Sequence, residues 1–236
     1  MPARTTGAGI KGDSLVRIRI LIGVAAALAL ALGARYVFFS GPSPDEKVDQ
    51  ARAKTEALVR AKDVEGLVKE VRSPDEHAAK LAVSALGDLG EAARPAVQEA
   101  LSDRRPAVRE KAATSFAKVA PREQAVKLAD MVKKDESPDV RAAAVTGLDC
   151  MFAFQEMDAI INAMEDPDPV VRRRASKAAT KFSGVTVQYN PHASLEECRQ
   201  GAQRMREYWQ QNKLNTMKLL TSYYQSLYQQ ATAGKE

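Results

Sequence analysis

The stretch Ser137-Pro138-Asp139-Val140-Arg141-Ala142-Ala143-Ala144 decides the fold, because the chain repeats its pattern. Matching stretches begin at Pro106 and Pro169, so the proline recurs after 32 residues and again after 31. A fourth copy, without the proline, fits residues 78–86. A period of this length is typical of stacked helix pairs, in which no single unit can bury its apolar face alone. The sequence therefore predicts an all-α solenoid of about five helix pairs.

Segments of different composition flank the repeats. The expected parts are a basic N-terminal tail at 1–17, an apolar segment at 18–40, an atypical first helix pair at 41–72, repeat units at 73–211 with a long loop at 183–193, and a C-terminal helix or tail at 212–236. Ser137 and Asp168 precede the unit-starting prolines, where a side-chain oxygen can accept from free N–H groups of the first turn. Ser194 and Glu197 have the spacing of a capping box.

The residues at 86–97 and 166–172, with proline, valine, arginine and alanine recurring in phase, resemble HEAT repeats of the subtype first defined in phycobilisome chromophore lyases. The resemblance covers about 73–211. It implies a scaffold that binds other proteins, and such repeats serve in many unrelated assemblies. A lyase-type or enzyme-accessory subunit is the alternative, and a HEAT-like nucleic-acid-binding protein is a further one. The segment 189–194, with its following glutamates and tryptophan, resembles the closing segment of bacterial membrane-anchored HEAT proteins.

The same resemblance assigns a structural role to one arginine in each later unit. In HEAT repeats of this kind the arginine ties neighbouring units together, which implies that role for Arg109, Arg141 and Arg172. The first full unit departs from the pattern, because Ala79 stands where the arginine belongs. The alternative is that these arginines lie on a solvated surface.

The segment from Ile20 to Phe39 is apolar except for Arg35. Twenty helical residues span roughly 30 Å, the thickness of a bilayer core. Basic residues before the segment favour an N-terminus inside and an exported repeat domain. The sequence thus predicts a single-pass membrane anchor. The alternative is a cleaved signal peptide and a secreted or periplasmic product.

The basic charge is concentrated at the N-terminus. The chain has a net charge of +5, of which residues 1–40 carry +4, so the rest is nearly neutral. A phosphate-binding surface needs several uncompensated cations on one face, which argues against nucleic acid as a partner. No acid/base pair, activated nucleophile or cysteine/histidine metal set is present, so neither catalysis nor a cofactor is expected. Cys150 and Cys198 are expected as small buried hydrophobes, with a disulfide or a reactive thiol as alternatives.

The second helix of each unit is expected to line the face that an unidentified protein partner contacts. The polar positions on that face are Arg94, Gln98, Gln124, Lys127, Asp158 and Asn162. No small-molecule substrate is expected there, because these residues supply no catalytic set.

The end of the repeat array has features of its own. We expect Tyr189, in the long loop, and Trp209 to fold over the open end as a cap, with a binding loop as the alternative. The apolar residues at 150–157 are expected to pack in the core, or else to line an exposed partner groove. Leu214, Met217 and Leu220 lie at helical spacing, which fits a capping helix, a partner-bound helix or a fraying one.

Overall fold

The computed structural model describes residues 43–233, and within that range it contains helices and no strands. Residues 50–233 belong to one compact unit. The predicted all-α repeat solenoid is confirmed. The segments at 1–17 and 18–40 lie outside the described residues. None of the helices between 43 and 233 is long and apolar enough to cross a membrane.

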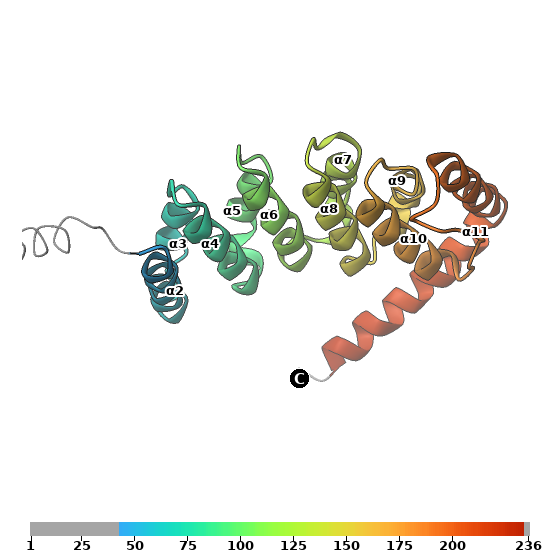
Figure 1. The fold of residues 1–236 in the computed structure, drawn as a ribbon. Helices are drawn as coiled ribbons and strands as arrows, with labels where there is room; N and C mark the ends of the chain where they lie inside the picture. The colour runs from blue at the N-terminus through green and yellow to red at the C-terminus, as the bar shows by residue number, and fades with distance from the viewer. Residues whose placement is uncertain (1–42, 234–236) are drawn as a thin grey trace, which may run out of the picture. The chain divides into compact units, whose positions relative to one another are not determined.

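Ten α-helices occur in the described range, and Figure 1 shows them as successive pairs. The helices are α2 (Pro44–Arg60), α3 (Val64–Val71), α4 (Glu76–Asp88), α5 (Arg94–Ala100), α6 (Pro106–Val119), α7 (Val126–Lys134), α8 (Pro138–Cys150), α9 (Met157–Ala163), α10 (Pro169–Ser183) and α11 (Leu195–Ala233). Short 3-10 turns link the members of three pairs: η1 (Glu91–Ala93), η2 (Arg122–Gln124) and η3 (Phe154–Glu156).

The unit starts follow the expected chemistry with one correction. Proline occupies the first turn of α6, α8 and α10, where it removes no needed donor. Asp168 accepts from the amides of Val170 and Val171, as predicted. Ser137 makes no side-chain cap, so that prediction was wrong. Its own amide instead donates to Asp135, which fixes the turn from the preceding loop.

The first helices α4, α6, α8 and α10 pack against one another in order along the chain. Close approach requires small residues at their contacts. A Cβ on Gly147 in α8 would lie 3.0 Å from the carbonyl oxygen of Ala113 in α6 and 2.6 Å from a methyl of Leu128. Larger side chains fill the spaces between pairs, with Phe116, Leu148 and Phe182 fully or almost fully buried. One continuous core therefore joins the repeat units.

The C-terminal part differs from the earlier units. Gly184 ends α10 in the left-handed conformation, and its amide donates to the carbonyl of Thr180. A long loop then leads to α11, whose start is held by the predicted capping box of Ser194 and Glu197. The boundary expected near residue 211 falls inside this helix, because α11 continues without interruption to Ala233. Figure 1 shows its C-terminal half extending back alongside the helix pairs.

Candidate functional site

Arg109 and Arg141 occupy the same position in α6 and α8 and make the same contacts. Arg109 donates from Nε and Nη2 to both carboxylate oxygens of Asp135, at 2.8 and 2.9 Å. Its Nη1 donates to two carbonyls of the loop before its own helix. Arg141 repeats this geometry with Asp166, at 2.7 and 2.8 Å. Each guanidinium thus joins the loop before one unit to the loop before the next.

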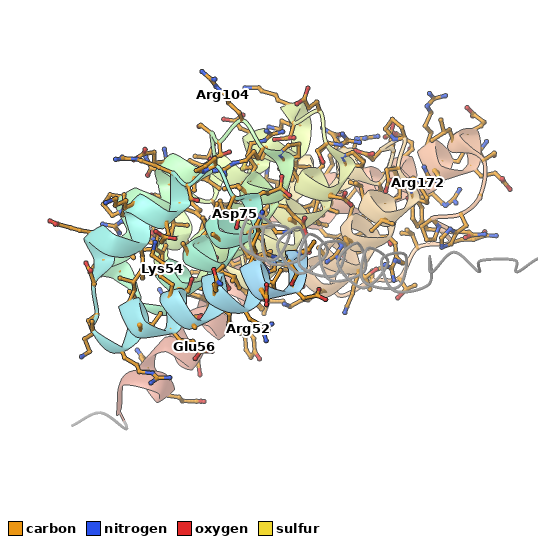
Figure 2. All side chains as sticks on the ribbon, turned by 60° about the vertical axis from the view of Figure 1, so that its left-hand side comes forward. Arg52, Lys54, Glu56, Asp75, Arg104 and Arg172 are labelled. Atoms are coloured by element: carbon orange, nitrogen blue, oxygen red, sulfur yellow. The ribbon has the colours of Figure 1, made fainter. Side chains whose placement is uncertain are left out.

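Arg172 in α10 ends this series and has a different partner. Its Nη1 donates to the carbonyls of Asp166 and Pro167, as in the other units. Its Nε donates to the carbonyl of Pro191 at 2.8 Å, so the long loop replaces the carboxylate of a following unit. Arg172 therefore fixes the loop that closes the array, and its place in α10 can be followed in Figure 2.

The departure at Ala79 is compensated by Arg105, which the sequence analysis did not single out. Arg105 donates to the carbonyl of Ser73 at 2.7 Å and to that of Val71 at 2.8 Å. It also contacts both carboxylate oxygens of Asp103, at 2.9 and 2.8 Å. Ser73 and Asp103 are equivalent to loop residues that Arg109 joins one unit later, whereas Val71 is the last residue of α3. The guanidinium thus reaches the junction from the following loop, whereas its neighbour Arg104 projects into solvent (Figure 2).

The aspartates of these junctions serve two purposes. Asp103, Asp135 and Asp166 each also accept from the amide two residues further on, which closes a turn in the loop. Hydrogen bonds from the Arg105 side chain hold the pKa of Asp103 below its ordinary value, against the opposing effect of burial. Burial acts to raise the pKa of Asp135, but the hydrogen bonds from Arg109 and the Ser137 amide outweigh it and the net shift is downward.

These arginines are enclosed by their partners. The side chains of Arg109 and Asp135 are 11% and 9% exposed, and those of Arg141 and Asp166 are 14% and 7% exposed. Removing one member of such a pair leaves an uncompensated charge in a nearly dry site. The donors are also committed to carboxylates and carbonyls, so they offer little to an external ligand.

The six polar residues predicted to contact a partner lie on or beside successive second helices. Gln98 in α5 and Asp158 and Asn162 in α9 are exposed, whereas Arg94, Gln124 and Lys127 are partly buried. Arg94 pairs with Glu91 at 3.0 Å within its own turn. The part of this face on α5 and α7 therefore presents polar side chains from two neighbouring units.

The part of that face on α9 is contacted by α11 through polar side chains, although Asp158 and Asn162 remain exposed. The sequence analysis did not foresee this contact. Arg206 donates to Asn162 at 3.0 Å and to Glu165 at 2.7 Å. Lys213 lies 3.8 Å from Asp158. The basic residues on one face of α11 were the available signal, but their acidic and amide partners lie more than forty residues earlier in the chain.

Tyr189 and Trp209 lie where α11 covers the last unit. The Tyr189 hydroxyl donates to the carbonyl of Met164, and its ring lies against Gly201, where a Cβ would come within 2.5 Å of the ring. Trp209 is 1% exposed. Burial is the main cause that raises the pKa of Tyr189 well above its ordinary value, and the adjacent Cys198 thiol raises this pKa further. Both aromatic side chains thus contact the protein itself.

The apolar residues at 150–157 are mostly core. Met151, Phe154 and Met157 are buried, but Phe152 is only partly so and has a positive φ of 56°. Cys198 is buried as expected, whereas Cys150 is exposed, which corrects the prediction for that cysteine. It lies at the last residue of α8, where the helix turns away from the core. Residues 43–233 contain no group of three or more acidic, histidine or cysteine side chains arranged to hold a metal ion.

The sequence profile of the HEAT repeat family matches residues 64–149 and, in a second alignment, residues 126–189. The two matches together span more than half of the chain. They coincide with α3 to α10, which contain the arginine junctions and the second-helix face. No curated protein matches the sequence at a significant level.

Solved structures with a similar backbone are distant. The complex of CpcE and CpcF of phycocyanin lyase from Nostoc sp. PCC7120 matches with a TM-score of 0.48 and 19% identity, covering 62% of each chain. This chain thus spans about three fifths of the lyase chain that it matches. A designed armadillo repeat protein matches with a TM-score of 0.43 and 16% identity, covering 72% of this chain and 95% of the designed one. These likenesses carry no functional argument.

Proposed function

Because the chain belongs to the HEAT repeat family, we propose that it is a non-catalytic, membrane-anchored scaffold of the bacterial type. In this proposal the second-helix face binds another protein. Stacked helical repeats present extended surfaces of this kind, and family members typically use them for protein–protein interaction.

The observation that carries the proposal is that the two helices of a unit have different contacts. The arginines of the first helices are committed to the junctions, as the contacts of Arg109 and Arg141 show. The second helices bury their apolar sides in the core and have polar residues on the other side, where Gln98 is exposed and Lys127 is partly buried. A surface that is polar, repeated and not needed for folding is available to a partner.

The anchor is the second part of the proposal. The apolar segment 20–39 has the length of a membrane span, and the basic residues before it favour an N-terminus inside and repeats outside. Removing residues 1–40 is expected to release the chain from membranes. Retention after a high-salt and carbonate wash would contradict the anchor. A mature N-terminus at or after residue 31 would instead identify a cleaved signal peptide.

Affinity capture from detergent-solubilised membranes tests the scaffold function. The variant with Gln98→Ala and Lys127→Ala should keep its fold and lose the protein that the unchanged chain captures. The matched control is Arg173→Ala with Lys177→Ala, two exposed positions on the first helix α10. Equal capture by both double variants would contradict the proposed face. Nucleic acid or a bilin pigment as the dominant bound species would favour the nucleic-acid or lyase-type alternative.

A further inference from the structure

The helix α11 consists of two halves that are held very differently. In the first half Cys198, Ala202, Met205 and Trp209 are all buried, at 1% exposure or less. In the second half Met217 and Leu220 reach the core but are only partly buried, while Leu214 and Leu219 are 76% and 72% exposed. The first half therefore belongs to the core of the last unit, whereas the second half rests on the surface of the repeat array.

The second half of α11 contacts two earlier units through a few side chains. The ring of Tyr224 lies 4.0 Å from the guanidinium carbon of Arg122. The rings of Tyr223 and Phe152 are 6.0 Å apart between centroids. The pair of Lys213 and Asp158 is largely exposed, and such pairs contribute little to stability. The contacts are real but few for a segment of this length.

The surface beneath this segment is incompletely satisfied. Arg122 Nη1, on the guanidinium that faces the ring of Tyr224, is buried and has no hydrogen-bond partner. A solvent-open cavity of about 370 Å³ lies among Arg122, Cys150, Phe152 and Tyr224. A buried polar atom without a partner is costly. The second half of α11 is thus an imperfect occupant of a surface that can accept a better one.

We infer that residues 212–226 act as a displaceable internal ligand, which occupies part of the partner surface until an amphipathic helix of another protein replaces it. The inference rests on the proposed scaffold function and names the class of its partner. Lys213, Met217, Leu220 and Tyr224 follow the i, i+4, i+7 and i+11 spacing of one helix face. The external helix presents a similar apolar stripe with an aromatic ring over Arg122, and adds a polar group that pairs with the free Nη1.

Displacement has a second consequence for the scaffold face. Lys213 lies 3.8 Å from Asp158, an exposed member of the predicted contact set on α9. Release of the segment removes this cation and leaves the Asp158 carboxylate free to pair with a partner. The intact chain consequently has a reduced affinity, because only the released fraction of molecules can bind.

A fluorescent peptide with the sequence of residues 210–230 is the probe, and the full chain in detergent is the starting protein. The chain shortened after Gln211, and the full-length release variant with Leu220→Asp and Tyr224→Asp, should bind the probe at least about tenfold more tightly than the unchanged chain. Emission from Trp209, the single tryptophan, reports whether each variant keeps its end cap. If shortening the chain changes this emission, the probe affinity of the full-length release variant is compared with that of the unchanged chain instead.

A chain in which the second half of α11 cannot be released is obtained with Tyr224→Cys. The new cysteine and Cys150 line the same cavity, while Cys198 is buried and protected, so a short bismaleimide can join the first two. The cross-linked chain should not bind the probe. The inference is overturned if the released, unchanged and cross-linked chains bind alike, or if none of them binds.

The probe-binding test uses purified chain and peptide and needs no cellular partner. Its outcome is therefore independent of the outcome of the capture test. Suppose that the released chain binds the probe more tightly than the unchanged chain, while the Gln98 and Lys127 changes have no effect on capture. That result contradicts the scaffold face and still supports the internal ligand. Capture that depends on those residues, with no difference in probe binding, contradicts the internal ligand alone.

Discussion

Arg141 and Asp166 are 25 residues apart in the chain and form a two-pronged ion pair, with Nε and Nη2 at 2.7 and 2.8 Å from the two carboxylate oxygens. The same arginine reaches back to the carbonyls of the preceding loop. A single side chain thus fixes the spacing of two neighbouring units, and the equivalent contacts of Arg109 extend the arrangement along the array.

The Arg141 junction predicts a large cost for its removal. Arg141→Ala should lower the free energy of unfolding by about 3 kcal/mol, because it leaves Asp166 buried without its partner. Lys133→Ala, an exposed control in the preceding unit, should change it by less than about 0.5 kcal/mol. Urea unfolding of chains without residues 1–40 measures both. Equal midpoints would contradict the structural role of Arg141.

Arg104 and Arg105 form a matched pair of neighbours for a second prediction. Arg105→Ala should destabilise the chain by about 1.5–3 kcal/mol, because it removes charge-assisted bonds to Asp103 and the Ser73 carbonyl. Arg104→Ala should be nearly neutral, since that side chain is exposed. Thermal unfolding compares the two. If the Arg104 variant were the less stable one, the compensation for Ala79 would be wrongly assigned.

Acid should weaken the junctions. The folded-state pKa of Asp135 is lowered, so its ion pair stabilises the fold above the unfolded pKa of about 3.9, and that contribution is lost as pH falls further toward the folded pKa. The difference in unfolding free energy between the unchanged chain and Asp135→Asn should therefore be constant near pH 6 and shrink below about pH 4. A difference that stays constant down to pH 3 would contradict this account.

The aromatic end cap predicts losses of different size. Trp209→Ala should cost about 3–5 kcal/mol, because it empties a buried site in the core. Tyr189→Phe should cost about 1 kcal/mol, because it removes one hydrogen bond to the Met164 carbonyl and keeps the ring. Calorimetric unfolding measures both changes. Variants that unfold at the same temperature as the unchanged chain but no longer capture the partner would show that the long loop is the partner's binding site.

The repeated pattern was sufficient to predict the helix pairs, because proline, arginine and alanine recur in phase and report which side of a helix is buried. It could not identify Asp135 or Asp166 as partners of the arginines. Those aspartates lie in loops about 25 residues downstream, and only the stacking of units brings them close. Arg105 was missed for a similar reason, since it stands one residue before the repeated pattern begins and reaches backward.

The C-terminal helix shows the limit of periodicity more clearly. The spacing of Met217, Leu220 and Tyr224 indicates one apolar face, but it does not say what covers that face. The structure places it against Arg122 and Phe152, residues of two earlier units. That choice depends on how far α11 extends beyond the last unit and on its direction there, which local sequence does not determine. Cys150 was misjudged because its exposure depends on how sharply the chain leaves α8.

Site-specific photo-crosslinking in intact membranes tests the central claim most directly. A photoreactive amino acid at Gln98 samples the second-helix face, and the same residue at Lys177 samples a first helix. The account predicts that the Gln98 position is cross-linked to a distinct protein and the Lys177 position is not. Cross-linking confined to Lys177, or none from either position, would contradict the proposal that the second helices bind a partner.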